Sequence, residues 1–239
     1  MATALVIDGA FFLRRFKWSF PGQDGTDPVK VAEAVRWMGF WHLALRMTPL
    51  VMDRAIKDQG FQPAESSELY RIFFYDCPPL TKRMHWPVSK RSVDLSKTPE
   101  AQFRNAVHVE LQKSRKVALR LGRLNDAFEW RLKPSAAKRL TEDGGGYRAT
   151  DDDFEIDTKQ KGVDMRLGLD VAAMAFKRQV NQIVLIAADA DFVPATKLAR
   201  REGIDVVLDP MGATPAIDLV QHVDGVRNCR MERPPLRAL

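Results

Sequence analysis

The strongest constraint on the fold is a regular alternation of helical segments and short apolar runs in the last third of the chain. Residues 163–176 have helical apolar spacing, and residues 182–187 form a buried β-type run. A second helix at 192–202, ended by Gly203, leads to a second strand at 204–208. Because helices that alternate with buried strands pack on both faces of a parallel sheet, we expect an open, three-layer α/β fold.

The first half of the chain adds further elements to this expected sheet. Residues 4–7 are a β-branched apolar run that ends at Asp8-Gly9, where a loop is expected, and residues 69–75 are a second such run. From Pro99 to about residue 121 the apolar spacing predicts one long helix. The remaining expected elements are two helices within 28–56, capped by Asp27 and separated at Pro49, a half-exposed strand at 128–132 and a helix at 214–223.

Positive charge is concentrated in one part of the sequence. The 239 residues carry a formal net charge of +6, yet residues 79–150 hold 16 Lys and Arg against 7 Asp and Glu. The rest of the chain holds 21 against 24, so it is net negative. A basic stretch of this kind is typical of a surface that binds nucleic acid. We therefore expect a single domain over residues 1–239 with a basic helical insertion at about 80–150.

Four carboxylates are expected to meet at one edge of the sheet. Asp8 follows the first strand, Asp189 and Asp191 follow the strand at 182–187, and Asp164 opens the helix that leads into that strand. Ligands of open α/β sheets bind at the carboxyl ends of the strands, near the switch in strand order. Carboxylates are the ligands that Mg²⁺ and Mn²⁺ prefer, and such ions activate water for phosphodiester hydrolysis. The pattern therefore predicts a divalent-metal site.

The same aspartates have a simpler, structural alternative. An Asp that follows a strand is frequently the N-cap of the next helix, where its side chain accepts a hydrogen bond from a backbone N–H. Asp191, which precedes Phe192, and Asp164, which precedes Met165, are the two candidates for this role. The metal site is favoured over isolated caps because the four residues are expected at one location.

Three short motifs near the two ends of the chain share their pattern with a known family. Ile7-Asp8-Gly9-Ala10 ends the first strand, Lys161-Gly162-Val163-Asp164 opens a helix, and residues 185–194 read Leu-Ile-Ala-Ala-Asp-Ala-Asp-Phe-Val-Pro. These motifs resemble the NYN domain, a family of PIN-like ribonucleases, and its LabA-like branch in particular. The resemblance covers roughly residues 1–80 and 155–225 and leaves the basic stretch unmatched.

The resemblance implies a PIN-like, Rossmann-like fold and a ribonuclease that needs Mg²⁺ or Mn²⁺ and acts on RNA rather than DNA. By that resemblance Asp8, Asp164, Asp189 and Asp191 are the catalytic, metal-binding residues. Asp170 is a further acidic position, but it lies about 240° around the helix from Asp164, so both cannot point directly into one site. Substrate contacts are expected from cations near the site and in the insertion, namely Lys161, Arg14, Arg15, Lys82 and Arg83.

Two positions depart from the family pattern. Phe11 stands where the first motif usually has Asn, and Ala187-Ala188 precede Asp189 where the family has Ser-Gly. The loss of these polar side chains leaves a second interpretation open, a non-catalytic nucleic-acid-binding or protein-interaction module that keeps the fold. Two other acidic-site enzymes are disfavoured. A haloacid-dehalogenase-like phosphatase needs Asp-x-Asp directly after the first strand, and a toprim nuclease needs Glu there.

The sequence also bears on location. No stretch approaches the roughly 20 apolar residues that a membrane helix needs, and the start of the chain lacks the basic segment of a secretory signal. Cys77 and Cys229 have no CxxC or His-paired spacing, so neither a disulfide nor a zinc site is expected. We expect a cytoplasmic protein with a nucleic-acid partner and no membrane partner. The exposed insertion could also serve as a contact surface in a homo-oligomer.

Overall fold

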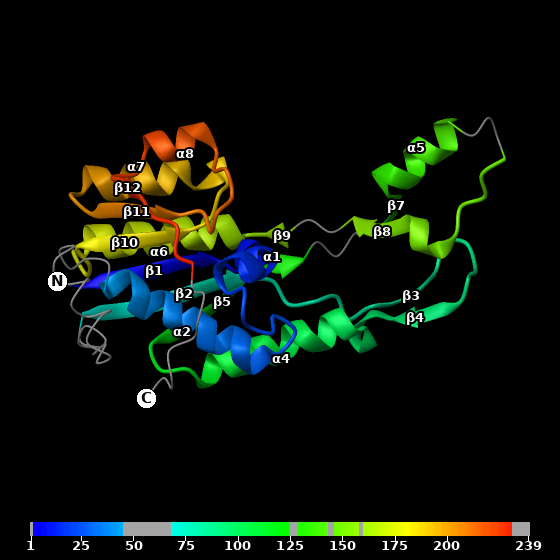
Figure 1. Ribbon diagram of the computed structural model, residues 1–239, viewed down its shortest axis with the longest axis horizontal. Helices are drawn as coiled ribbons and strands as arrows, with labels where there is room; N and C mark the ends of the chain where they lie inside the picture. The colour runs from blue at the N-terminus through cyan, green and yellow to red at the C-terminus, as the bar shows by residue number, and fades with distance from the viewer. Residues whose placement is uncertain (1, 45–67, 125–128, 143–145, 158–159, 231–239) are drawn as a thin grey trace.

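A parallel sheet of six strands forms the centre of the computed structural model, which describes residues 2–44, 68–124, 129–142, 146–157 and 160–230 (Figure 1). The strand order is β12-β11-β10-β1-β2-β5, and every neighbouring pair is parallel. The chain starts in the middle at β1, builds one side and then returns to build the other, so the order switches beside β1. The strands are β1 (Thr3–Asp8), β2 (Leu69–Asp76), β5 (Val117–Leu121), β10 (Gln182–Ile186), β11 (Asp205–Asp209) and β12 (Gly225–Val226).

Helices cover both faces of the sheet, which confirms the expected three layers (Figure 1). Alternate residues of β1 point to opposite faces: Leu5 and Ile7 join one apolar cluster, whereas Ala4 and Val6 join the other. The first cluster packs under α1 (Gly9–Ser19), α2 (Pro28–Ala44) and α4 (Pro99–Lys113), and the second under α6 (Val163–Phe176), α7 (Val193–Arg201) and α8 (Ile217–Gln221). Within the described ranges, no helix is both long and apolar enough to cross a membrane.

The turn from β1 into α1 contains no loop, contrary to the sequence-based expectation. Asp8 ends the strand and caps the helix at once, because its carboxylate accepts a hydrogen bond from the Phe11 N–H at 3.0 Å. Gly9 makes the tight turn feasible. A Cβ on this residue would lie 2.4 Å from the ring of Phe74 and 2.7 Å from the carbonyl oxygen of Tyr75. Arg14 and Arg15 therefore lie on a helix that begins at the sheet edge.

The predicted long helix over 99–121 is wrong in its second half. The helix α4 ends at Lys113, where the backbone N–H of Ser114 bonds to the carbonyl of Leu111. Lys116 then adopts a positive φ of 63°, and the chain turns into β5, the edge strand beside β2. Apolar residues recur in both parts, so helical spacing alone could not reveal the reversal at 114–116.

Most other sequence-based elements are confirmed. The helix α2 begins at Pro28, and Asp27 accepts a hydrogen bond from the Val29 N–H at 2.9 Å. The part of the predicted helical pair beyond residue 44, including Pro49, lies outside the described residues. The helix α6 has the predicted bounds, and the predicted helix at 192–202 is a short turn, η3 (Ala190–Phe192), that leads into α7.

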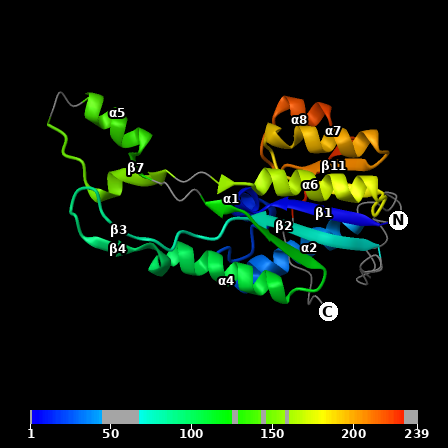
Figure 2. The same ribbon diagram turned by 180° about the vertical axis from the view of Figure 1, so that it is seen from behind.

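The stretch from the end of β2 to the start of α6 also builds an extension beyond the sheet, here called the arm. Both views show it reaching past the carboxyl ends of the central strands (Figures 1 and 2). It is made of two antiparallel hairpins that are far apart in the sequence, one before β5 and one after it. Its elements are β3 (Arg83–His85), β4 (Ser92–Asp94), β7 (Glu129–Leu132), α5 (Pro134–Glu142), η2 (Asp151–Asp153) and β8 (Phe154–Asp157).

Specific contacts join the two hairpins of the arm. The rings of Trp86 and Trp130 stack with centroids 4.7 Å apart, and the Trp130 indole N–H donates to the carbonyl of His85 at 2.9 Å. The carboxylate of Asp151 accepts hydrogen bonds from the backbone N–H groups of Val88 and Ser89 at 3.0 and 3.1 Å. At its base, β6 (Arg123–Leu124) pairs with β9 (Gln160–Lys161). The arm is therefore an ordered substructure, while α4 and β5, from the same stretch, pack in the central fold.

Much of the basic charge predicted for the insertion is neutralised in the folded arm. Arg139 pairs with Asp153 at 2.5 Å, and Arg131 pairs with Glu155 at 2.7 Å. These acids follow residue 150, so a count along 79–150 misses them. The first hairpin, residues 82–94, stays basic, with four Lys and Arg against one Asp. The described residues of 129–157 hold five Lys and Arg against seven Asp and Glu.

Candidate active site

The predicted carboxylates do lie at the switch in strand order. Asp8 ends β1, and β10, the parallel neighbour of β1, leads directly into Asp189 and Asp191. Asp164 is the second residue of α6, the helix that packs against β2, β5 and η3. All four residues therefore stand where an open α/β sheet forms its ligand crevice.

The charges of these residues act on one another. Partial burial is the main cause that raises the pKa of Asp164, and the negative charges of Asp191 and Asp189 raise it further. Burial also raises the pKa of Asp8; the Phe11 N–H and Arg14 oppose that shift, and the charge of Asp164 adds to it. Mutual repulsion of this kind is relieved by a bound cation.

Two of the four aspartates are also N-caps, one of a helix and one of a short turn, although they are not the two named from the sequence. Asp189 caps η3 by accepting the Asp191 N–H at 3.2 Å, and Asp8 caps α1. The expectation of Asp191 or Asp164 as a cap is wrong. The N-cap of α6 is Gly162, which has a φ of 77° that favours glycine. Capping holds Asp8 and Asp189 in place at the edge of the sheet.

Sequence reasoning missed a further aspartate at this edge, Asp76. It ends β2 next to β1, is fully buried, and its charge acts on Asp8. Its two oxygens bond Arg104 at 2.6 Å and His108 at 2.8 Å, both from α4. The available signal was its position directly after a buried strand, the same position that identified Asp8.

Asp170 lies outside the group of four. Its carboxylate accepts hydrogen bonds from the Tyr75 hydroxyl and from Arg120 Nε, each at 2.9 Å. It thus joins α6 to β2 and β5, in agreement with the angle between residues 164 and 170 on the helix. Its side chain fastens the helix to the sheet.

The predicted substrate-binding cations are spread over three places. Arg14 is exposed on α1 and is close enough to lower the pKa of Asp8. Arg15 instead donates to the carbonyl of Met211 at 3.0 Å. Lys82 and Arg83 belong to the first hairpin of the arm, where Arg83 pairs with Asp94 at 3.3 Å and stays 78% exposed. Lys161 lies on β9, and its side chain is outside the described part of the chain.

A cleft of about 470 Å³ opens between the carboxyl end of β2, the start of α4 and β8. It begins at Cys77, the residue after Asp76, and so adjoins the acidic edge. A cleft of this volume with mixed walls is typical of a ligand site. Its apolar lining includes Pro78, Leu95 and Phe154, and its charged lining includes Arg104, Lys133, Glu100 and Glu155.

The two departures from the family pattern are explained by packing. The Phe11 side chain is 7% exposed and packs in the core under α1, so this position offers no polar group to the site. Ala187 is buried, and the carbonyl of Ala188 accepts the Ala216 N–H at 3.0 Å. The aspartates therefore lack the neighbouring polar side chains that the family usually has.

The four carboxylates are not drawn tightly together. One set of three His, Cys, Asp or Glu side chains in the described residues has ligand atoms that all lie within 4.8 Å of one another. It consists of His42, Asp209 and Cys229, and it includes none of the four carboxylates. The donor chemistry of the acidic site, all carboxylate oxygen, fits Mg²⁺ or Mn²⁺, which also keep several water ligands.

Comparison with protein families gives one match, the NYN domain over residues 145–224. The matched stretch includes Asp164, Asp189 and Asp191, and it confirms the family that the motifs resemble. A search of curated proteins and a search of solved structures each returned no significant match.

Proposed function

Residues 145–224 of this chain match the NYN domain, and from that premise we propose that the protein is a metal-dependent ribonuclease. The acidic edge would be its active site, and RNA would be preferred over DNA. Action in the cytoplasm and membership of the LabA-like branch are parts of the same proposal.

One observation carries the proposal: carboxylates from three separate segments converge at the switch in strand order. Asp8, Asp164 and the pair after β10 are linked by their effects on each other's pKa. Isolated helix caps would not raise each other's pKa in this way. Negative charge gathered at a ligand crevice favours binding of a dication.

The four carboxylates, Asp8, Asp164, Asp189 and Asp191, would hold Mg²⁺ or Mn²⁺. When bound, the ion would neutralise the negative charge of the substrate phosphate and activate a water molecule. Asp8 and Asp189 are fixed by their caps, so they suit rigid ligation. Asp164 is exposed and can orient an attacking water by accepting its hydrogen bond. Arg14, next to Asp8, can attract the substrate phosphate.

The substrate strand would run from the acidic edge along the cleft toward the basic hairpin of the arm. The cleft offers apolar walls for bases. Its cations Arg104 and Lys133 already donate to Asp76 and to the Asp152 carbonyl, each at 2.6 Å, so phosphate contacts are expected mainly from the hairpin. In the hairpin, Lys90 and Arg91 are exposed. We therefore attribute RNA binding to residues 82–94 and the cleft rather than to the whole basic stretch.

A second candidate function is a non-catalytic nucleic-acid-binding module. It is favoured by Ala187 and Ala188 beside the site and because, among the described residues, no three of the carboxylates have oxygens that all lie within 4.8 Å of one another. Such a module would bind RNA equally well after its aspartates were changed to Asn.

The deciding experiment is cleavage of a labelled RNA pool and a matched single-stranded DNA with Mn²⁺, Mg²⁺ or EDTA. Wild type is compared with Asp8→Asn, Asp189→Asn and the control Asp205→Asn. Asp205 starts β11 at the opposite, amino edge of the sheet. We expect cation-dependent RNA cleavage in wild type and Asp205→Asn and its loss in the other two variants. No cleavage with any cation, together with unchanged RNA binding in all variants, would overturn the proposal.

A further inference from the structure

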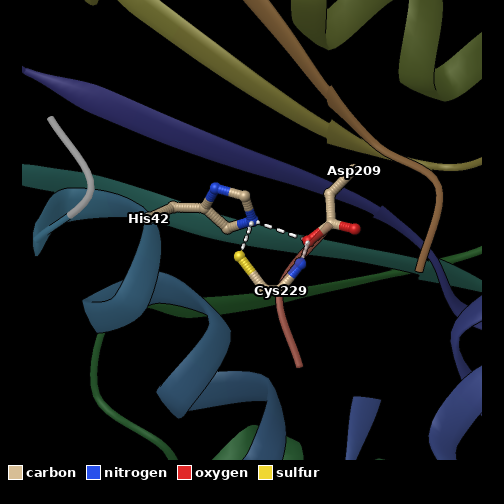
Figure 3. Close-up of side chains that lie close together, drawn as sticks. All are labelled: His42, Asp209 and Cys229. Carbon is tan, nitrogen blue, oxygen red and sulfur yellow. Dashed lines mark hydrogen bonds and ion pairs between the residues drawn. The ribbon is translucent and has the colours of Figure 1, made fainter. Parts of the chain in front are cut away.

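A second cluster of ligand-type side chains lies inside the molecule, apart from the acidic site. Figure 3 shows His42 of α2, Asp209 at the end of β11 and Cys229, which follows β12, pointing at one another. His42 lies 167 residues from Asp209 and 187 residues from Cys229 along the chain. His42 and Asp209 are fully buried and Cys229 is 2% exposed, so the cluster is enclosed in the core under α1 and α2.

The donor atoms of the three side chains are close to ligand spacing. His42 Nε2 lies 3.0 Å from Asp209 Oδ2 and 3.4 Å from Cys229 Sγ (Figure 3). The Asp209 carboxylate is oriented by the backbone, since Oδ1 accepts the Met211 N–H at 2.8 Å and Oδ2 accepts the Cys229 N–H at 3.2 Å. Outer hydrogen bonds of this kind orient ligands in metal sites.

Hydrogen bonding within the cluster leaves the imidazole poorly satisfied. Nε2 can carry a single proton, yet an oxygen and a sulfur both face it. His42 Nδ1 is buried with no hydrogen-bond partner among the described residues. In the metal-free cluster the Asp209 carboxylate can only accept, so the imidazole proton lies on Nε2; because Nδ1 has no partner, the proton can move there when Nε2 becomes a metal ligand.

The chemistry of this donor set differs from that of the acidic edge. Imidazole nitrogen, thiolate sulfur and carboxylate oxygen are the ligands of Zn²⁺ and similar borderline ions, whereas Mg²⁺ prefers oxygen alone. With a neutral imidazole the three ligands carry two negative charges, which a dication would cancel. Burial and the negative charge of Asp209 raise the pKa of the Cys229 thiol, and Arg227 opposes that rise only in part, so the thiol keeps its proton until a dication displaces it.

We propose that His42, Asp209 and Cys229 bind a transition-metal dication of the Zn²⁺ class. On binding, a metal–sulfur bond forms and the thiol proton leaves to solvent, while the imidazole proton occupies Nδ1. Three protein ligands leave the fourth position of a tetrahedral ion to water. The ion would fasten α2 and the segment after β12 to the end of β11.

The test uses Co²⁺ as a spectroscopic probe for Zn²⁺ in the full chain, purified under reducing conditions and treated with chelator. We expect about one equivalent of Co²⁺ per chain, a sulfur-to-cobalt charge-transfer band, and displacement of that band by Zn²⁺. Zn²⁺ should also raise the Tm of the wild type, because it binds the folded state. Metal content by mass spectrometry gives the stoichiometry independently.

The matched control is Cys77, the other buried cysteine that forms no disulfide, which lines the cleft. Cys77→Ser and Asp8→Asn should keep the charge-transfer band, and Cys229→Ser should lose it. Folded wild type that takes up neither ion would overturn the proposal whatever the variants do. A band that persists in Cys229→Ser would also overturn it. The band reports sulfur ligation alone, so its outcome is independent of the ribonuclease assay.

Discussion

The sheet and the arm are held together by different forces. Two apolar clusters pack on the faces of the sheet, and its strands β1 and β10 are almost entirely buried. The arm instead depends on an indole stack, on Asp151 and Asp153 as acceptors, and on ion pairs at its surface. The sheet should therefore be a rigid platform for the acidic edge, whereas the arm should respond to pH and salt.

The largest expected effect comes from Asp76→Ala, at the join between the sheet and α4. The substitution leaves the Arg104 and His108 side chains without their buried partner, which should lower the free energy of unfolding by about 3–5 kcal/mol. Urea denaturation measures the change. The control is Glu110→Ala, which removes an exposed pair with Lys113 and should cost about 1 kcal/mol or less. Equal costs for the two variants would contradict the tight attachment of α4.

A second substitution tests how closely the platform is packed. Gly9→Ala forces a Cβ against Phe74 and the Tyr75 carbonyl, so unfolding should become easier by about 1–3 kcal/mol. Gly168→Ala, at a helical position of α6 with open space around it, should stabilise the protein by about 0.5–1 kcal/mol. Thermal denaturation distinguishes the opposite signs, and a neutral Gly9→Ala would mean that the turn after β1 can relax.

Acidification should affect the two regions in opposite directions. The Thr150 backbone N–H, Tyr147 and Arg139 lower the pKa of Asp153 to about 2. The ionised carboxylate therefore stabilises the arm fully at any pH above about 3.8, the pKa of the same group in the unfolded chain. That contribution is lost as the pH falls through the folded value. At the acidic edge, burial and then mutual repulsion raise the pKa values of Asp8 and Asp164, so protonation there removes a buried charge and stabilises the fold instead. Near-ultraviolet circular dichroism of the Trp86–Trp130 stack should report the loss, and Asp153→Asn should reduce the pH dependence of that signal to the part that Asp151 contributes.

The smallest effect expected is on RNA affinity. Replacing both Lys90 and Arg91 with Ala in the basic hairpin should weaken RNA binding and reduce the slope of log K against log salt by about 1–2. Lys138→Ala, which removes a cation already paired with Glu142 on α5, is the control and should leave the slope unchanged. Equal slopes for all three proteins would mean that the arm does not contact the RNA backbone.

Local patterns were enough to predict four of the six strands of the sheet, β1, β2, β10 and β11, and the position of the aspartates that follow β1 and β10. The β-branched runs before Asp8 and Asp189 identified adjacent strands, and their carboxyl ends necessarily lie at one edge. The strand at 117–121 was missed because its residues continue the apolar spacing of α4, and the reversal depends on the positive φ of Lys116. Periodicity carries no information about such a local turn.

Features that depend on distant residues could not be predicted in this way. His42, Asp209 and Cys229 have no motif spacing, because three separate elements bring them together. The charge of the arm was overestimated for a similar reason, since its cations pair with acids that follow residue 150. Charge counted along a sequence is not the charge of the folded surface.

The most direct test of the account measures cleavage and binding separately on the same labelled RNA. Asp189→Asn should reduce the single-turnover cleavage rate with Mn²⁺ by roughly 100-fold or more while leaving the Kd for RNA unchanged. The Lys90→Ala, Arg91→Ala double variant should raise the Kd and keep the cleavage rate at saturating RNA. An Asp189→Asn protein that still cuts RNA would contradict an active site at the acidic edge. If both variants lost cleavage and binding together, the arm would not be a separate binding surface.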